Sequence, residues 1–382
     1  MEDVAIIGGG LAGAAAAWHL ATAGRQVRLF ERDVAPRHKI CGEFFSVEAQ
    51  AMLRDIGLDP ATLGASAIDR LRLVHGRSTA EIDLPFRAYG MTRRKMDAVL
   101  LDRAEAAGAT VERGVTVRAL DGMVLQLQSG RVTGRHQILA SGKHDVRGTK
   151  RVSRGTVADL IGFKNYFRLA PSQQAALAGY VEVMLFPGGY AGLQLVENQV
   201  ANLCLLVTRA TFADAGDWLQ LLGRLRAFCG HLDDRLAGAE ALLDRPLTIA
   251  GVPYGFRYRP ASSDLPQRFR VGDQAAVIPS FSGDGMAIAL HSGRGAAGAI
   301  LGGEDARSFH ARQRREFGGQ IRLAGALYQL GRPAALQPLL VDIARQWPGL
   351  AARLATWTRI PPAYRSNRSA PSRSISDASW VT

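Results

Sequence analysis

The sequence predicts an α/β fold in which a Rossmann-like domain is interrupted by a mostly antiparallel sheet and followed by C-terminal helices. An apolar, β-branched run at Val4–Ile7 leads into a glycine-rich turn and an alanine-rich helix. From about residue 157 to 258, the pattern changes to strands with longer apolar and aromatic runs. A strand ending in Gly-Asp at 268–273 then returns to the first pattern. We therefore expect the first domain to be discontinuous.

The glycine-rich turn is typical of a dinucleotide-binding site. Gly8, Gly10 and Gly13 form G-x-G-x-x-G where a strand passes into a helix. Gly8 permits the tight turn, Gly10 lets the backbone approach a pyrophosphate, and Gly13 lets the helix lie close to the strand. Together with Leu11 and Ala12, this turn is expected to direct free backbone N–H groups at phosphate.

A second strand at 26–30 ends at Glu31, which is followed by Arg32. A carboxylate at this place can accept hydrogen bonds from both hydroxyl groups of an adenosine ribose, and it disfavours a 2′-phosphate. The turn, the helix and this acid therefore favour FAD or NAD over NADP as the bound nucleotide.

Several further elements are expected around the inserted sheet. The segment Arg93–Asp97 opens an amphipathic helix, and 110–120 with 123–128 form a hairpin. Three successive antiparallel strands are predicted, at 181–186, 190–196 and 201–207. In the middle strand, alternation places Tyr190 and Gln194 on the more polar side, which we expect to be the wall of a ligand cavity.

The domain boundaries follow from these changes in pattern. We expect a cofactor domain at 1–70, 93–155 and 262–305, a substrate-binding sheet domain at 71–92 and 156–261, a helical segment at 306–361 and a disordered tail at 362–382. The oligomeric state does not follow from the sequence.

The composition and charge of the chain limit the classes of function that are expected. The 382 residues carry a formal net charge of +13 and are 47% hydrophobic, which indicates a globular chain. Only 5 of the 47 basic residues are lysines and the arginines are scattered, so nucleic-acid binding is not expected. The charge fits an anionic small molecule or a peripheral contact with an anionic membrane. No transmembrane segment is predicted, and three widely spaced cysteines favour the cytoplasm.

Taken together, residues 1–300 resemble the FAD-dependent oxidoreductases of the geranylgeranyl reductase and aromatic hydroxylase (p-hydroxybenzoate hydroxylase-like) superfamily. The segment starting at Arg93 resembles that family's Arg-x-x-Phe-Asp helix start, which implies that Arg93 lies near the ribityl or pyrophosphate group. The pair Gly272-Asp273, followed by Pro279, resembles the family's second FAD segment. In this resemblance, Asp273 accepts a hydrogen bond from the ribityl chain.

The second FAD segment ends in a helix start at Gly283, Asp284, Gly285 and Met286. Such a helix would direct free N–H groups and about half a positive charge at the flavin edge that becomes negative on reduction. The alternative is an ordinary helix start capped by Ser282 or Asp284.

Two departures affect the choice of reaction. Many aromatic hydroxylases carry Ala-Asp-Gly where this chain has Ala140-Ser141-Gly142. The segment Pro36–Glu43, which includes Cys41 and Gly42, is closer to geranylgeranyl reductases and flavin-dependent halogenases. The halogenase signature Trp-x-Trp-x-Ile-Pro is matched only in part by 357–361.

The resemblance implies an FAD enzyme that receives electrons from NAD(P)H. Family frequencies favour a monooxygenase that hydroxylates an aromatic or polyketide-like small molecule through a flavin C4a-hydroperoxide, as in secondary metabolism. The alternatives are a reductase of C=C bonds, a halogenase and a non-catalytic flavin-binding protein. No metal site is expected. The candidate catalytic residues are Cys41, Tyr190, Gln194, Pro279, Phe281, Gly283 and Gly285, and Lys164 and Arg168 are further cavity candidates.

Overall fold

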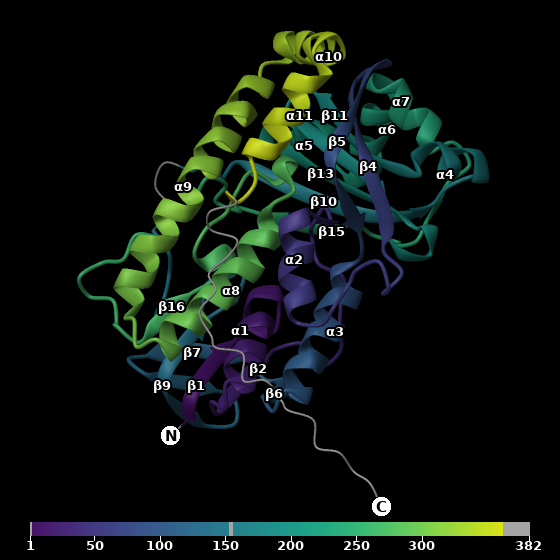
Figure 1. Cartoon of the computed structure of the whole chain (residues 1–382). Helices are drawn as coiled ribbons and strands as arrows, with labels where there is room; N and C mark the ends of the chain where they lie inside the picture. The colour runs from purple at the N-terminus through teal and green to yellow at the C-terminus, as the bar shows by residue number, and fades with distance from the viewer. Residues whose placement is uncertain (1, 153–155, 362–382) are drawn as a thin grey trace, which may run out of the picture.

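Parallel strands from distant parts of the chain form most of the first sheet, which ends in two strands that pair antiparallel (Figure 1). The structure is a computed structural model and describes residues 2–152 and 156–361. The strands of this sheet are β1 (Glu2–Ile7), β2 (Val27–Glu31), β6 (Thr110–Arg113), β7 (Val117–Asp121), β8 (Val124–Leu127), β9 (Arg131–Leu139) and β16 (Arg268–Arg270). Their order is β6-β2-β1-β9-β8-β7, with β16 paired to β9. Because β16 follows the second sheet in sequence, the predicted discontinuity is confirmed.

The predicted hairpin is only half correct. Strands β7 and β8 pair antiparallel, but Thr110–Arg113 pairs parallel with β2 in the main sheet. The chain turns at Gly114, whose φ is +77°. This left-handed turn separates two strands that the sequence pattern had joined.

Helices cover the first sheet and fix the glycine turn. They are α1 (Leu11–Thr22), α2 (Val47–Asp55), α3 (Arg93–Ala106) and α8 (Gly285–Leu301). Helix α1 packs against both α8 and α3. At Gly293 of α8, a Cβ atom would lie 2.2 Å from the backbone oxygen of Ala12. The small residues therefore allow the two helices to come unusually close.

The second sheet is mostly antiparallel, as predicted. Its strands are β3 (Phe44–Phe45), β4 (Ser66–His75), β5 (Ser78–Gly90), β10 (Leu160–Arg168), β11 (Gly179–Phe186), β12 (Gly189–Leu195), β13 (Ala201–Thr208), β14 (Glu240–Ala241) and β15 (Leu247–Ala250). The order is β14-β10-β13-β12-β11-β4-β5-β3, with β15 on β10 and a parallel pairing between β4 and β11.

Two groups of helices flank the second sheet. One group is α4 (Pro171–Leu177), α5 (Arg209–Ala215), α6 (Trp218–Phe228) and α7 (Gly230–Arg235). The other is α10 (Gln337–Gln346) and α11 (Pro348–Trp357), which pack on β5. Short 3₁₀ turns lie at 197–199, 272–274, 280–282 and 334–336.

Helix α9 (Ala306–Gly331) connects the two halves of the molecule. It starts beside β16 and rises to α10 at the top of the view (Figure 1). Across the described ranges, no helix combines the length and apolar character needed to cross a bilayer. The predicted tail at 362–382 lies outside the described residues.

Candidate active site

A cavity of about 1280 Å³ lies between the first sheet, the start of α8 and the second sheet. It begins at the carboxyl ends of β1 and β9, where Gly8 and Ala140 line its wall. Strand β1 lies at the centre of the sheet, with β2 on one side and β9 on the other. The connections that leave the carboxyl ends of neighbouring strands therefore run to opposite sides here and leave a crevice between them. Ligands of open α/β sheets bind at such a point.

The glycine turn has the geometry that its sequence predicts. Gly8 has φ +104°, and a Cβ atom there would lie 2.5 Å from the backbone oxygen of Ala140. A Cβ at Gly13 would lie 2.0 Å from the oxygen of Gly8. Gly10 faces the cavity, and a Cβ atom there would have Arg93 Nη2 as its nearest neighbour, at 3.3 Å. In the described part of the chain, no side chain caps the start of α1, so its first N–H groups are free for an anion.

Glu31 is fixed at the end of β2 by two backbone groups. Its Oε2 accepts a hydrogen bond from Gly9 N–H at 2.7 Å, and its Oε1 accepts one from Asp33 N–H at 3.0 Å. Both Glu31 and Arg32 line the cavity. A carboxylate oxygen can accept more than one hydrogen bond, so Glu31 keeps the capacity to bind ribose.

Basic side chains surround the glycine turn. Arg93 Nε donates to Asp97 Oδ1 at 2.8 Å, and Lys39 Nζ lies 2.8 Å from Asp97 Oδ2. Burial of Asp97 opposes its ionisation, but these two cations hold its pKa below the usual value. One carboxylate thus balances two cations and leaves a net positive charge beside Gly10, which suits a diphosphate.

The second predicted FAD segment meets the first from the other side. Gly272 has φ +59°, and its N–H donates to Ser292 Oγ at 2.8 Å. Asp273 lines the cavity, 3.5 Å from Lys143 Nζ. Gly285 and Met286 bring the amino end of α8 to the cavity wall.

Asp284 does not face the cavity. Its carboxylate accepts a hydrogen bond from Ser46 Oγ at 3.1 Å and lies 3.6 Å from Arg359 Nη1. Burial raises the pKa of Asp284 to about 7 against the opposing effect of Arg359. Ser282 donates to Pro279 O instead of capping α8. Within residues 2–152 and 156–361, no side chain caps the start of α8, and its N–H groups remain available to a ligand.

The second sheet supplies a polar wall. Tyr190 and Gln194 line the cavity, whereas Ala191, Leu193 and Leu195 pack in the core on the opposite face. The Tyr190 ring lies edge-on to Phe281, with 6.2 Å between their centroids. The Tyr190 hydroxyl is buried without a hydrogen-bond partner in the described chain. A buried hydroxyl in this state is a group that a ligand can satisfy.

Most of the predicted site residues meet in this cavity. Those that line it are Gly8, Gly10, Leu11, Ala12, Glu31, Arg32, Cys41, Gly42, Arg93, Tyr190, Gln194, Gly272, Asp273, Phe281, Gly283, Gly285 and Met286. Gly13, Pro279 and Asp284 are not among the lining residues. Arg168 lies at the outer end of β10 and pairs with Glu240. The individual roles of these residues stay predictions.

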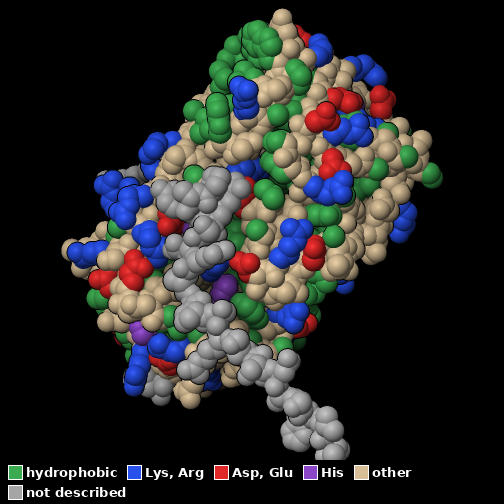
Figure 2. Space-filling model, viewed as in Figure 1, with side chains coloured by type: hydrophobic (Ala, Val, Ile, Leu, Met, Phe, Trp, Pro, Cys, Tyr) green, Lys and Arg blue, Asp and Glu red, His purple; other side chains and the backbone are tan. Residues whose placement is uncertain are grey.

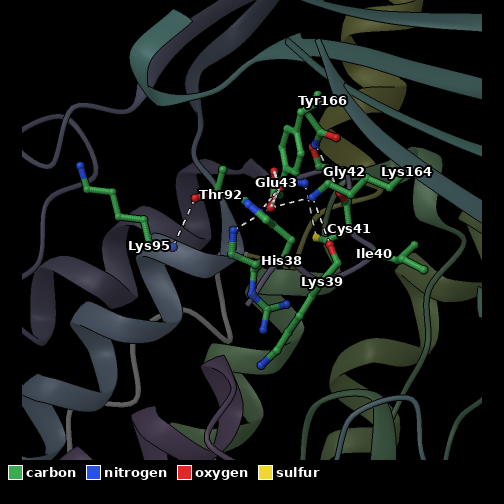
Figure 3. A network of polar contacts seen from close by, with 12 residues as sticks. His38, Lys39, Ile40, Cys41, Gly42, Glu43, Thr92, Lys95, Lys164 and Tyr166 are labelled. Atoms are coloured by element: carbon green, nitrogen blue, oxygen red, sulfur yellow. Dashed lines mark hydrogen bonds and ion pairs between the residues drawn. The ribbon is translucent and has the colours of Figure 1, made fainter. Parts of the chain in front are cut away.

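Lys164, a cavity candidate from the sequence, is not among the lining residues and belongs instead to a buried polar network beside the cavity, which the sequence did not predict (Figure 3). Lys164 and Tyr166 project from β10 towards Glu43, which follows Cys41 and Gly42 in the loop. Because side chains alternate along a strand, Lys164 and Tyr166 lie on the same face of β10, and the sequence could have predicted that they are neighbours. The partner across the chain could not be inferred from the sequence.

The residues present fit FAD. The free N–H groups of α1, with Arg93 and Lys39, would hold its diphosphate, and Glu31 would hold its adenosine ribose. Asp273 and the start of α8 would lie at the flavin end. The cavity exceeds the range of about 300–1,000 Å³ that is typical of one small-molecule site, so it has room for a second molecule.

Comparison with known proteins agrees with this fit. A family model described as "FAD dependent oxidoreductase" matches residues 3–42. Digeranylgeranylglycerophospholipid reductase 2 of Methanopyrus kandleri is 27% identical over 316 residues, which are 76% of this chain and 75% of the relative. Menaquinone reductase of Mycobacterium tuberculosis is 27% identical over 318 residues, covering 77% and 75% of the two chains.

Solved structures share the whole fold. The flavin-dependent brominase Bmp2 has a TM-score of 0.73 at 19% identity, over 93% of each chain. The halogenase PltM, solved with phloroglucinol and FAD, has a TM-score of 0.72 at 15% identity, over 95% of this chain and 89% of its own. The predicted fold class is thereby confirmed.

The fold, the glycine turn and these relatives define the chain as an FAD-dependent oxidoreductase. It is similar in sequence to digeranylgeranylglycerophospholipid and menaquinone reductases, and it shares its fold with flavin-dependent halogenases. The relatives described above that match three quarters of the chain are named reductases. They favour the alternative interpretation of the sequence, reduction, over hydroxylation.

Proposed function

We propose that this enzyme uses FAD to reduce a carbon–carbon double bond in a long apolar substrate of the isoprenoid type. The observation that carries the proposal is the far end of the cavity. Beyond Tyr190 and Phe281 it continues between the second sheet and helices α9–α11. Its lining there is aliphatic: Leu71, Leu73, Leu84, Val181, Val183, Leu185, Leu327, Leu340, Ile343, Leu350 and Leu354.

An aliphatic arm of this kind suits a hydrocarbon chain. Burying a chain gains about 0.8 kcal/mol for each CH₂ group removed from water. A small aromatic acid would leave most of the arm unfilled and would find few polar partners there. The reductase relatives, whose names include geranylgeranyl groups and menaquinone, support the same substrate class.

The residues of this chain would divide the work as follows. Bound FAD supplies the hydride. The start of α8 would stabilise negative charge at the flavin end, and the sheet would keep water from the double bond. Tyr190, whose hydroxyl is buried and whose ring packs edge-on against Phe281, would give the second carbon its proton.

The test is a single turnover without oxygen. The holoprotein is reduced, mixed anaerobically with a geranylgeranyl lipid, and followed by flavin absorbance and product mass. We expect the flavin to reoxidise while the lipid gains two hydrogen atoms, and Tyr190→Phe to slow this step. A flavin that reoxidises only with oxygen, giving a product with one added oxygen atom, would establish hydroxylation instead. A product that forms only with halide would establish halogenation.

Two further features belong to this proposal. NAD(P)H is the proposed electron source, and bleaching of the flavin by NADH or NADPH would show it.

We also propose a peripheral contact with a lipid surface, because Trp347 and Leu350 both line the cavity and are exposed. The free cysteines fit a reducing compartment such as the cytoplasm.

A further inference from the structure

Glu43 and Lys164 form an ion pair that is fully removed from solvent. Lys164 Nζ lies 2.7 Å from Glu43 Oε1, and both side chains are 0% exposed. Lys164 comes from β10 of the second sheet, whereas Glu43 ends the loop that carries Cys41 and Gly42 (Figure 3). Burying two charges is costly, and apolar side chains of similar volume often serve stability as well or better. The pair therefore suggests a role besides stability.

The surroundings hold the Glu43 charge in one place. Its carboxylate accepts hydrogen bonds from Tyr166 Oη at 2.9 and 3.0 Å and from Arg93 N–H at 2.7 Å. Its backbone oxygen accepts one from Gln194 Nε2 at 2.9 Å. Glu43 has φ +61°, a conformation that side chains other than glycine rarely adopt. Contacts from several elements thus maintain a strained backbone that holds this carboxylate buried behind the cavity wall.

Glu43 lies close to both segments that are expected to hold FAD, and Lys164 lies behind it. Glu43 lines the cavity and accepts a hydrogen bond from the backbone N–H of Arg93, whose side chain lies beside Gly10. The next residue, Phe44, lies against Gly283 at the start of α8, where a Cβ atom would be 2.8 Å from Phe44 Cδ1. Because both side chains are buried, their charges act on the cavity more strongly than charges in water would.

We propose that the Lys164–Glu43 pair sets the electrostatic potential at the flavin end of the cavity and thereby the ease with which bound FAD is reduced. Lys164 favours the electron-rich reduced form, Glu43 opposes it, and the two effects nearly cancel. Both are positioning residues that act through the field and need not touch the reacting atoms. The inference depends on FAD binding and is independent of which reaction the flavin performs.

The experiment measures the midpoint potential of FAD in the full-length holoprotein, by equilibration with a redox dye. Lys164→Met removes the positive charge and should make FAD harder to reduce. Glu43→Gln removes the negative charge and should make FAD easier to reduce. We expect each change to shift the reduction equilibrium by about tenfold, in opposite directions, and the double variant to return towards wild type.

Two controls separate charge from structure. Tyr166→Phe deletes a hydrogen bond to Glu43 without changing any charge, and should leave the potential unchanged. Glu182→Gln removes an equally buried carboxylate from the opposite face of the second sheet, and should also leave it unchanged. Shifts of the same sign in both single variants, or shifts no larger than that of Glu182→Gln, would overturn the proposal. If Lys164→Met binds no FAD, the same measurement is made on Lys164→Gln, which should likewise make FAD harder to reduce.

Discussion

Gly10 and Gly13 belong to one motif, yet a methyl group should have different effects at the two positions. Gly10 has φ −75°, which alanine adopts readily, and its nearest neighbour is the flexible Arg93 side chain. Gly10→Ala should fold normally but weaken FAD binding by about tenfold or more, since the methyl group occupies the phosphate's place. Fluorescence titration of the apoprotein with FAD measures this loss.

Gly13→Ala should instead damage the fold. Its methyl group would lie 2.0 Å from the oxygen of Gly8, so α1 must move away from β1. We expect a loss of about 1–3 kcal/mol in the free energy of unfolding of the apoprotein, measured in urea. Equal stability losses in the two alanine variants would contradict the assignment of Gly10 to binding and Gly13 to packing.

Asp284 should make stability depend on pH in an unusual direction. Its pKa rises from 3.8 to about 7 in the folded state because of burial. The folded protein therefore holds a proton that the unfolded chain releases, and stability falls as pH rises from about 4 to about 7. Asp284→Asn should remove this pH dependence, which amounts to up to about 4 kcal/mol in the free energy of unfolding. Thermal unfolding of both proteins from pH 4 to 8 gives the difference. Parallel curves would show that Asp284 titrates normally.

At the scale of elements, a buried charge cluster attaches α7 to the second sheet. Glu182 on β11 accepts hydrogen bonds from Arg235 Nη2 at 2.9 Å and lies 3.0 Å from His231 Nε2. Although burial opposes it, His231 and Arg235 lower the pKa of Glu182 to about 2. Because the folded-state pKa is depressed, this stabilisation is present above about pH 4.5 and is lost as pH falls towards 2.

Glu182→Gln should accordingly lower the free energy of unfolding by about 3 kcal/mol at pH 7, because it leaves the buried guanidinium of Arg235 without its carboxylate partner. The difference from wild type should shrink at pH 3. The control is Asp234→Asn, which removes an exposed ion pair with Arg77 and should change stability by less than about 1 kcal/mol. Urea unfolding at both pH values measures both variants. A loss in Glu182→Gln no larger than the control's would refute the role of the cluster.

Local patterns predicted the elements well where the physical cause was local. The glycine turn, the end of β2 at Glu31 and the two faces of β12 each follow from a few adjacent residues. The hairpin prediction failed because Gly114 splits one apolar run into strands with different partners. The Glu43–Lys164 pair joins two segments far apart in sequence, so only the packing of β10 against the loop could show it. The turn of Asp284 towards Arg359 is likewise a tertiary result.

On the scale of the whole molecule, the cavity runs from the glycine turn, where the anionic diphosphate of FAD is expected, to the apolar surface around Trp347 and Leu350. Helix α9, about 40 Å long at 1.5 Å per residue, carries the chain from the first sheet to α10 (Figure 1). Hydrophobic side chains gather at the top of the molecule, over α10 (Figure 2). Leu339 of α10 and Trp347, which follows this helix, are 52% and 55% exposed, and Trp357 at the end of α11 is 59% exposed. Exposed tryptophans beside an apolar cavity are typical of a surface that enters the membrane interface.

The last prediction tests this surface. Wild-type holoprotein should co-sediment with vesicles of phosphatidylcholine and phosphatidylglycerol, because the exposed tryptophans would enter the interface and Arg353, an exposed residue of α11, would attract anionic headgroups. The double variant Trp347→Ser, Trp357→Ser should lose at least about tenfold in vesicle affinity and keep its FAD. Leu219→Ser, which changes a residue 77% exposed on α6, is the matched control and should bind as wild type does. If wild type stays in the supernatant, or if Leu219→Ser weakens binding equally, the apolar end of the cavity receives its substrate from solution.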